Sequence, residues 1–506
     1  MAAGLMHDAL EQAAIRFGAR TALVAGDQSW SFRDLDTLSS RFAADLIGRG
    51  VRPGDRVALM TSNRPEFVVA VHGISKAGAA SVLFSPAWKA IEAKHALALT
   101  DPVCAVTDGP ATEMLGGLLG GARITDLDQP SGVGGVSTRG DERRGRAGMD
   151  DTEAVLVFSS GTTGLPKAVR HTHRSIGAGT AHWCQTLGLG PDDRFQVATP
   201  ASHILGLLNL LAAATAGATV RLHRRFDIDE VLHRIEDEKM TLEMAVAPIA
   251  LALANHPHLE DFDLSSLRFI MWGATPVTQH VAAVVTERTG VRWLPAYGAS
   301  ELPVIAVNPV DSPASWRLDS VGLPPVGVHL RVADLESGVV LPPGGVGEIQ
   351  VRSPSVMAGY LPPEATPSAF AGEWYRTGDV GWLEPEGWVH LTDRAKEMIK
   401  VNGFQVAPAE IESVLQGHPA VIDCAVFGLE DERAGEVPVA VVQLDPGQPL
   451  AEGELEQLVA GSLATYKRIH HVVTVESIPR LPSGKVLRRT LRDEWTPVLM
   501  RTRADN

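Results

Sequence analysis

A stretch of nine residues, from Ser159 to Lys167, contains the residue types that bind phosphate groups. It reads SSGTTGLPK, so hydroxyl side chains are interspersed with glycines and a lysine ends the run. Glycines allow successive backbone N–H groups to converge on an anion, and a lysine adds a positive charge. The same composition is also typical of an ordinary polar hairpin loop. The phosphate-binding hypothesis involves Ser159, Ser160, Gly161, Thr162, Thr163, Gly164 and Lys167.

The segments on both sides of this loop are expected to be extended. Residues 154–158 form a short apolar run typical of a buried strand, and residues 168–173 form a second extended segment. A phosphate loop of the Walker type instead leads into a helix and has a different spacing of glycine and lysine. We therefore expect a loop that joins two strands and is not of the Walker type.

A second group of residues suited to chemistry, Tyr297 to Glu301, follows an apolar run at residues 291–296. Ligand sites of α/β proteins commonly lie where a strand ends. The ring of Tyr297 can stack on a purine, and the oxygens of Ser300 and Glu301 suit Mg²⁺. A simple turn with a surface glutamate would give the same pattern. The expected metal ligands are Ser300 and Glu301.

The composition limits the classes of function. The 506 residues indicate two to four domains, and the hydrophobic share of 45% is enough for ordinary cores. The formal net charge of −15 disfavours a nucleic-acid partner, so an anionic ligand has to be bound by local cations and backbone N–H groups. The three cysteines, Cys104, Cys184 and Cys424, form no disulfide or zinc pattern, which favours a cytoplasmic location.

No segment of the chain is expected to span a membrane. The N-terminus lacks the basic region and apolar core of a signal peptide, and residues 4–17 fit an amphipathic helix. The most apolar stretch, residues 204–220, contains Gly206, Asn209 and Gly217. We interpret it as a buried helix followed by a turn.

The order of the predicted elements indicates an α/β fold. A strand at residues 56–60, a helix at 66–79 and an extended segment at 80–84 form a βαβ rhythm. A polar, glycine-rich stretch at residues 129–150 interrupts this rhythm, and we expect it to be an exposed loop. Further strands are expected at 194–199, 218–223 and 266–271, with a charged helix at 228–240.

The chain is expected to divide into a large and a small domain. From about residue 318 the sequence becomes rich in Gly and Pro with short strands, which indicates a β-rich subdomain. The residues after 393 form an α+β unit. We predict a large N-terminal domain of α/β layers over residues 1–392 and a small α+β C-terminal domain over residues 393–506.

Four further motifs follow in the second half of the chain. Together with the two described above, they resemble in type and order the motifs of the adenylate-forming superfamily, which includes acyl-CoA synthetases and 4-coumarate–CoA ligases. The resemblance extends from about residue 30 to about residue 489, and it implies that the C-terminal domain is mobile. The four motifs are Tyr375-Arg376-Thr377-Gly378-Asp379, Asp393-Arg394, Lys400 to Pro408 and Pro479 to Lys485.

The resemblance implies a nucleotide site. SSGTTGLPK would hold the β- and γ-phosphates of ATP, and Gly273 to Pro276 would form one wall of an adenine slot where small residues leave room for the base. Asp379 would accept hydrogen bonds from the ribose hydroxyls, as acidic residues do in dinucleotide-binding folds. The implied cofactor-binding residues outside the phosphate loop are Gly273, Ala274, Thr275, Tyr297, Gly298, Ser300, Asp379, Arg394 and, for CoA, Gly403.

The resemblance also implies two catalytic loops. Lys485 would bridge the carboxylate and the α-phosphate, where its charge suits the negative charge that develops at phosphorus. Gly403 would allow close approach of the pantetheine arm of CoA, although Asn402 replaces a lysine common in 4-coumarate–CoA ligases. Asp393 matches the hinge that would bring the two loops into play in turn. The implied catalytic residues are Lys485, Lys400, Gln405, Glu301 and His203.

The acyl pocket is expected to be apolar. His203 matches a residue that gates the acyl and CoA tunnels, and no aspartate is present in its motif to hold a substrate amine, which argues against an amino-acid substrate. Leu205 stands where 4-coumarate–CoA ligases often have a tyrosine, so we favour an aliphatic, alicyclic or simple aromatic acid. The expected pocket residues are His203, Leu205, Trp272, Pro303 and Val304.

These observations predict an AMP-forming carboxylic acid–CoA ligase. The enzyme would make acyl-AMP from the acid and ATP with Mg²⁺, and coenzyme A would then displace AMP through its sulfur nucleophile. Two alternatives are an acyl-AMP ligase that loads a carrier protein and a catalytically silent acyl- or nucleotide-binding protein. Pyrophosphate release with a panel of acids, with and without CoA, distinguishes them.

Overall fold

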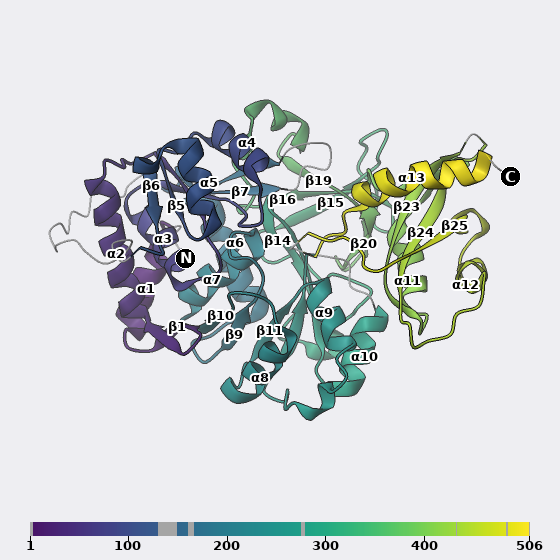
Figure 1. Cartoon of the computed structure of the whole chain (residues 1–506), viewed down its shortest axis with the longest axis horizontal. Helices are drawn as coiled ribbons and strands as arrows, with labels where there is room; N and C mark the ends of the chain where they lie inside the picture. The colour runs from purple at the N-terminus through teal and green to yellow at the C-terminus, as the bar shows by residue number, and fades with distance from the viewer. Residues whose placement is uncertain are drawn as a thin grey trace.

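The computed structural model describes residues 4–129, 149–159, 166–274, 279–431, 433–481 and 484–504. The expected loop at 129–150 lies almost wholly outside the described residues. In Figure 1 the large N-terminal region runs from purple through teal to green. The smaller C-terminal region, the name used here for the described residues from Ile399 onward, lies on the right in yellow-green and yellow.

A seven-stranded sheet contains the two strands that hold the ends of the phosphate loop. Val57 and Leu59 contact one hydrophobic core while Ala58 and Met60 contact another, so this sheet is covered on both faces and its strands are continuous apolar runs. The βαβ prediction for residues 56–84 is confirmed. The strand order is β17 (Gly359–Leu361), β8 (Lys167–Thr172), β7 (Glu153–Ser159), β4 (Ala80–Leu83), β3 (Arg56–Met60), β5 (Cys104–Thr107) and β6 (Ile124–Asp126).

The expectation that the SSGTTGLPK loop joins two strands is confirmed. β7 and β8 are antiparallel, and Ser159 pairs with Lys167 at the end of the ladder. Of the residues between them, 160–165 lie outside the described part of the chain. The strand ends therefore fix where the loop leaves and re-enters the sheet.

Two four-stranded sheets complete the α/β part of the N-terminal region. β11, β12 and β13 are parallel, and β13 turns directly into the antiparallel β14. One sheet has the order β2 (Gln28–Ser31), β1 (Thr21–Ala25), β10 (Thr219–Leu222) and β9 (Arg194–Val197), and the other has the order β11 (Leu242–Ala245), β12 (Phe269–Trp272), β13 (Trp293–Ala299) and β14 (Leu302–Val307).

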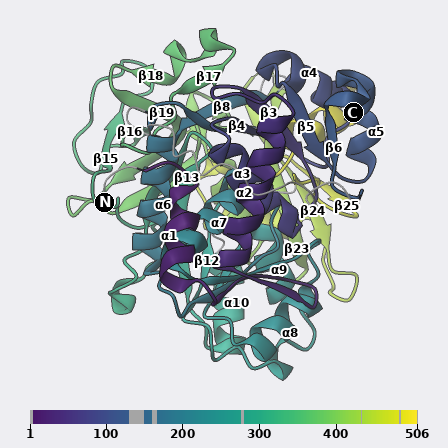
Figure 2. The ribbon, with the colours of Figure 1, turned by 90° about the vertical axis from the view of Figure 1, so that its left-hand side faces the viewer.

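The helices cover these sheets. Figure 2 shows α1, α2 and α3 beside one another on one face of the N-terminal region, where their contacts bury a shared apolar surface. The apolar stretch at residues 204–220 forms a buried helix that ends at Gly217 with a φ of 78°, as predicted. Among the described residues no helix is long and apolar enough to span a membrane. The α-helices of this region are α1 (Asp8–Phe17), α2 (Phe32–Gly48), α3 (Pro65–Lys76), α4 (Ala90–Thr100), α5 (Pro110–Leu119), α6 (His173–Leu187), α7 (Ile204–Ala216), α8 (Ile228–Glu238), α9 (Ala247–Ala254) and α10 (Gln279–Thr289).

A five-stranded antiparallel sheet forms the predicted β-rich part before the C-terminal region. Its last strand ends at Arg394, and the next strand begins at Ile399, so residues 395–398 alone connect this sheet to the C-terminal region. The strands are β15 (His329–Ala333), β16 (Gly347–Arg352), β18 (Phe370–Ala371), β19 (Trp374–Leu383) and β20 (Val389–Arg394).

The C-terminal region is an α+β unit built on its own sheet. Side chains of β23 alternate between its two faces, so Val426 packs with α11 and α12 while Phe427 packs with α13. The strands are β22 (Phe404–Val406), β21 (Ile399–Val401), β24 (Gly435–Leu444), β23 (Val421–Asp431) and β25 (His471–Val475), and the helices are α11 (Pro408–Leu415), α12 (Glu454–Ser462) and α13 (Arg488–Ala504).

Candidate active site

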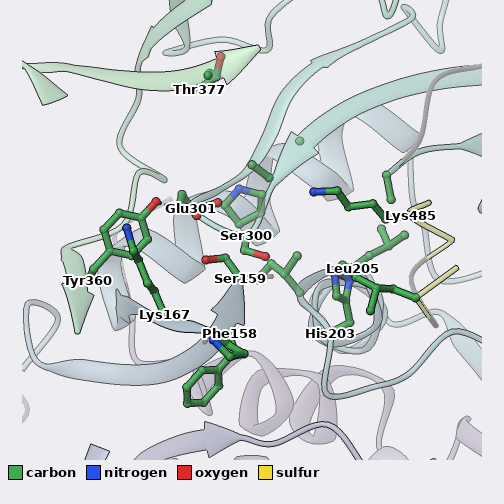
Figure 3. Close-up of a pocket in the computed structure, with 18 of the residues that line it drawn as sticks. Phe158, Ser159, Lys167, His203, Leu205, Ser300, Glu301, Tyr360, Thr377 and Lys485 are labelled. Carbon is green, nitrogen blue, oxygen red and sulfur yellow. Dashed lines mark hydrogen bonds between the residues drawn. The ribbon is translucent and has the colours of Figure 1, made fainter. Parts of the chain in front are cut away.

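A cavity of about 890 Å³ lies where the sheets of the N-terminal region meet the C-terminal region. Its wall includes the ends of the phosphate loop, the start of α7, the β13–β14 turn, β19 and the loop that precedes α13 (Figure 3). The sequence-predicted residues that line it are Ser159, Lys167, His203, Leu205, Gly273, Ala274, Tyr297, Gly298, Ser300, Glu301, Pro303, Arg394 and Lys485. The predicted residues Ser160, Gly161, Thr162, Thr163, Gly164 and Thr275 lie outside the described residues.

The β13–β14 turn is held in place by backbone geometry. Ala299 pairs with Leu302, so Ser300 and Glu301 form the turn itself. A Cβ atom at Gly298 would lie 2.1 Å from the carbonyl oxygen of Pro303, so only glycine permits this close approach of the two strands. The turn therefore presents Ser300 and Glu301 to the cavity from a fixed backbone.

Two side chains from other elements orient this turn. Tyr360 donates a hydrogen bond from its hydroxyl to Oε1 of Glu301 at 2.8 Å. Burial lowers the pKa of His171 to about 4, so the ring is neutral and its Nε2–H donates to the carbonyl oxygen of Ser300 at 2.8 Å. The carboxylate and the turn that carries it are thus positioned before any ligand binds.

A metal ion at this turn would need ligands from outside the protein. Among the described residues no group of three His, Cys, Asp or Glu side chains is arranged to hold a metal ion. Ser300 and Glu301 offer two hard oxygen ligands, and Mg²⁺ commonly takes its other ligands from phosphate oxygens and water. The residues present therefore fit a Mg²⁺ ion that arrives with a triphosphate.

Tyr297, Asp379 and Arg394 form a buried chain of polar contacts. The Tyr297 hydroxyl donates to Oδ2 of Asp379 at 2.5 Å, and Nε of Arg394 lies 2.8 Å from Oδ1. Burial and the nearby Asp379 raise the pKa of Tyr297. Asp379 is not itself a lining residue, whereas its neighbours Thr377 and Gly378 are. The structure thus gives Asp379 a clear role in fixing Arg394, while its contact with ribose stays a prediction.

Three cations converge on the cavity from two parts of the chain. Arg394 ends β20, Lys396 follows it in the connection, and Lys485 comes from the C-terminal region. Burial, Arg394 and Lys485 lower the pKa of Lys396 to about 8, and burial with Arg394 also lowers the pKa of Lys485. The positive charges destabilise one another, as the lowered pKa values show, so an anionic ligand bound between them would stabilise their charged forms.

The loop that carries Lys485 is anchored to the C-terminal sheet. Arg480 forms a two-pronged ion pair with Asp423, at 2.7 and 3.0 Å, and donates to the carbonyl oxygen of Gly484 at 2.8 Å. The backbone N–H of Leu481 also donates to the carbonyl oxygen of Lys485. A bidentate arginine–carboxylate pair fixes orientation as well as distance, so the lysine is held on a defined support.

The other predicted catalytic loop does not reach the cavity. Lys400, Gly403 and Gln405 lie on the β21–β22 hairpin, are exposed, and do not line the cavity. Asn402 and Gly403 form its two-residue turn with φ values of 50° and 84°. This turn type prefers Asn-Gly, which gives Asn402 a conformational role where its sequence position suggested only a missing lysine.

The predicted hinge residue, Asp393, lies within a strand. It pairs with Val380 in the β19–β20 ladder, and Oδ2 of its carboxylate accepts the backbone N–H of Ala409 at the start of α11 at 2.9 Å. Burial raises the pKa of Asp393 to about 6. Asp393 therefore links the last strand before the connection to the first helix after it, and the residues free of a strand are 395–398.

The acyl end of the cavity differs in part from the prediction. His203 and Leu205 line it, and burial lowers the pKa of His203 to about 4, so its ring is neutral. Trp272 and Val304 do not line the cavity: they are 1% and 0% exposed. Side chains alternate along a strand, so Val304 points to the opposite side of β14 from Pro303, which lines the cavity. Trp272 packs into a hydrophobic core at the end of β12, and the next residue, Gly273, lines the cavity.

The sequence prediction missed several lining residues. Trp183, Leu208, Tyr360, Tyr375 and Lys396 all line the cavity. Tyr375 had a signal, since it belongs to the Tyr375–Asp379 motif already singled out, and Lys396 lies between two such motifs. Trp183 had none, because a tryptophan in an apolar helix is indistinguishable by sequence from an ordinary core residue.

Comparison with known proteins gives consistent matches along the chain. The family model for AMP-binding enzymes matches residues 10–361, and the model for the C-terminal domain of AMP-binding enzymes matches residues 410–485. A 4-coumarate–CoA ligase from Vanilla planifolia is 32% identical over 509 residues, which cover 94% of this chain and 91% of that protein.

Solved structures agree with the sequence matches. The ATP-bound MatB from Rhodopseudomonas palustris is 26% identical with a TM-score of 0.88, and the alignment covers 97% of this chain and 99% of that one. The o-succinylbenzoate–CoA synthetase from Bacillus subtilis, in complex with its acyl-adenylate, is 31% identical with a TM-score of 0.84, covering 96% of this chain and 98% of that one. The fold and the predicted superfamily are thereby confirmed.

Proposed function

This chain belongs to the AMP-binding enzyme family and is an AMP-forming acid–CoA ligase, and we propose that its substrate is an uncharged aliphatic, alicyclic or simple aromatic monocarboxylic acid. The enzyme uses ATP and CoA with Mg²⁺. The two steps of this reaction require different residues of the chain.

The cation cluster supports the first step. The carboxylate oxygen of the acid attacks the α-phosphorus of ATP, a new P–O bond forms, and the bond to the β-phosphate breaks to release pyrophosphate. Lys485 stabilises the negative charge that develops at the α-phosphorus, with Arg394 beside it. Glu301 and Ser300 would hold the Mg²⁺ ion, which would supply positive charge beside the phosphates.

The second step needs a different face of the C-terminal region to point toward the cavity. The sulfur of CoA attacks the acyl carbon, a C–S bond forms, and the bond to AMP breaks. We assign Lys400, Gly403 and Gln405 to this step, although the hairpin that carries them lies outside the cavity. A rotation about the connection at residues 395–398 would exchange the Lys485 loop for this hairpin. The two moving bodies would then be the residues before 395 and those after 398, so the boundary predicted at residue 393 shifts to the end of β20.

The observation that carries the substrate proposal is the distribution of charge along the cavity wall. The charged lining residues include Glu301, Arg394 and Lys485, which belong to the motifs assigned above to the nucleotide and its phosphates. The lining residues contributed by α6, by residues 200–208 and by Pro303 carry no charged side chain, and His203 is neutral. A second carboxylate or an ammonium group would be buried there without a partner, which is costly.

The test is a panel of acids assayed for ATP-dependent pyrophosphate release, with mass spectrometry of the thioester formed when CoA is present. We expect straight-chain, cyclic and unsubstituted aromatic monocarboxylic acids to be used, and dicarboxylic acids and amino acids to be poor substrates. Preferential use of a dicarboxylic acid would contradict the substrate proposal. Acyl-AMP formation without transfer to CoA would favour the carrier-protein alternative.

The three free cysteines fit our proposal of a cytoplasmic enzyme.

A further inference from the structure

Trp183 forms part of the cavity wall from a helix that carries no predicted site residue. It lies in α6, is 3% exposed, and lines the cavity together with Leu205 and Leu208 of α7. Its indole Nε1 donates a hydrogen bond at 2.8 Å to Oδ1 of Asn209, also in α7. A large aromatic face is therefore fixed against the apolar end of the cavity.

Asn209 accepts this hydrogen bond from a buried position in α7. It is fully buried in a helix that is otherwise apolar on its core side, and it does not line the cavity. Its Nδ2 has no hydrogen-bond partner among the described residues. A buried polar group is costly unless it forms hydrogen bonds, and a buried indole N–H usually has a partner. Rotating the indole of Trp183 would break its hydrogen bond to Asn209 and leave two buried polar groups without it. The hydrogen bond therefore favours one orientation of the tryptophan ring.

The neighbouring elements bring Trp183 to the acyl side of the cavity. Leu208 and Asn209 lie three and four residues after Leu205, which places both next to it on the surface of α7. On α6, Gly179 lies one turn before Trp183, and a Cβ atom there would be 3.3 Å from Cγ of Pro303. The absence of that side chain lets Pro303, itself a lining residue, pack against α6.

Trp183, Leu205, Leu208 and Pro303 thus converge from α6, α7 and β14, elements that pack on one another. None of the four carries a charge, and the indole is by far the largest. The Pro200–Ala201 turn fixes the start of α7, because a Cβ atom at Gly206 would lie 2.3 Å from the carbonyl oxygen of Pro200. The wall has little room to shift and accept a larger group.

We propose that Trp183 is the end wall of the acyl site, that it sets the upper limit on the size of the acid, and that Asn209 is a positioning residue that holds it. This inference rests on the proposed function and adds a specificity-determining residue to it. An acid that fits places its apolar end against the indole, and a longer acid clashes with it.

The experiment measures kcat/KM for acyl-AMP formation along a series of straight-chain acids and a series of para-alkyl benzoic acids. Trp183→Ala and Trp183→Phe are compared with the unmodified enzyme. Because one methylene in an apolar pocket changes kcat/KM by roughly tenfold or more, we expect Trp183→Phe to shift the optimum to longer acids and Trp183→Ala to shift it further. The Phe variant keeps the test open if the Ala variant fails to fold.

Two further variants separate specificity from stability. Trp293→Phe truncates a buried tryptophan whose Nε1 donates to the carbonyl oxygen of Ala282 and which does not line the cavity, so it should lower thermal stability without changing the ranking of acids. Asn209→Leu should shift the ranking in the same direction as Trp183→Phe, mainly through KM for the longer acids.

The outcomes distinguish the two proposals. An unchanged ranking in Trp183→Phe, in an enzyme that forms acyl-AMP, would overturn the role of Trp183. If Trp293→Phe shifted the preferred acid length by the same amount, the effect of Trp183→Phe would reflect a general loss of packing, and the proposal would be wrong. Preference of the unmodified enzyme for charged acids would instead remove the proposed substrate class on which the inference rests.

Discussion

Two loops of the C-terminal region carry predicted catalytic residues, but only one of them lines the cavity. The loop with Lys485 lines the cavity and is tied to the C-terminal sheet by the Arg480–Asp423 pair. The β21–β22 hairpin with Gly403 is exposed and stays outside, with Phe404 stacked on Tyr466 at a ring separation of 4.5 Å. Both belong to one folded unit, so the unit must move for the second loop to take the place of the first.

The difference between the two loops indicates which half-reaction this structure fits and where the C-terminal region could rotate. The cation cluster of Arg394, Lys396 and Lys485 is assembled at the cavity, and the proposed adenylation step would use this arrangement. The connection at residues 395–398 is the only stretch free of a strand between the two sheets. Hinges are generally a few residues that absorb large changes in φ and ψ.

The largest effect is expected from Lys485→Ala. Removing a group that stabilises transition-state charge typically lowers the rate about 10²–10³-fold, so acyl-AMP formation should fall by that amount. Thioester formation from supplied acyl-AMP should be largely unaffected. Lys400→Ala is the matched control from the exposed hairpin, and it should retain acyl-AMP formation while it impairs the second step. Equal losses in both half-reactions of Lys485→Ala would contradict the assignment.

The next largest effect is expected from a rigid connection. Proline at position 396 fixes φ near −65°, so Lys396→Pro should hinder the rotation and lower thioester output by about 10²-fold, the cost of a misplaced catalytic group. Lys396→Ala controls for the lost charge. The two half-reactions are measured separately for each variant.

The position of the pivot is tested by a second proline variant. Asp393→Pro alters the strand end and should retain acyl-AMP formation while it loses most of the thioester output if Asp393 takes part in the rotation. Normal thioester formation in Asp393→Pro, together with its loss in Lys396→Pro, would place the pivot at residues 395–398. Normal thioester formation in both variants would refute the two-arrangement interpretation.

A smaller effect is expected at the turn of the exposed hairpin. Gly403 has a φ of 84°, and a Cβ atom there would meet no atom within 4 Å. Gly403→Ala should therefore leave acyl-AMP formation intact and lower thioester formation by roughly tenfold, from backbone strain of about 1–2 kcal/mol. Asn402→Gly preserves the turn and should have little effect. Loss of acyl-AMP formation in Gly403→Ala would show that the hairpin already serves the first step.

The last prediction concerns stability and not catalysis, at Asp393, which joins β20 to α11. Its pKa is raised to about 6 from 3.8, so its contribution to stability is fully present below pH 3.8 and is lost as the pH rises through 6. This amounts to about 1.4 kcal/mol of unfolding free energy per pH unit within that window. Asp393→Asn should flatten this part of the profile, measured by denaturant unfolding between pH 4 and 7. An unchanged slope would show that Asp393 is not the titrating group.

Local sequence patterns determined a large part of this protein. The apolar runs at residues 56–60 and 154–158 and the buried helix in residues 204–220 are all present in the structure, because continuous apolar segments must be covered on every side. The phosphate loop was correctly placed between two strands. The Asn402–Gly403 hairpin was equally readable from its sequence, since few residues adopt the positive φ values of such a turn.

Only the tertiary structure decided which side of each strand faces the cavity. Trp272 and Val304 were expected in the acyl pocket because they adjoin motif residues, yet they pack into the core while Gly273 and Pro303 line the cavity. A shift of one residue reverses the direction of a side chain, and no sequence pattern in these short, fully buried strands reports the register.

Trp183 and the two catalytic loops show the same limit at longer range. The indole lines the cavity and donates a hydrogen bond to Asn209, 26 residues later, while Gly179 on the same helix lets Pro303 approach. The sequence motifs identified Lys485 and Gly403 as candidate catalytic and CoA-binding residues. Which of the two lines the cavity depends on how the C-terminal region is oriented. Residue type and local conformation are properties of neighbouring residues in the chain, whereas a shared cavity is made by contacts between distant segments, and those contacts form only when the sheets pack.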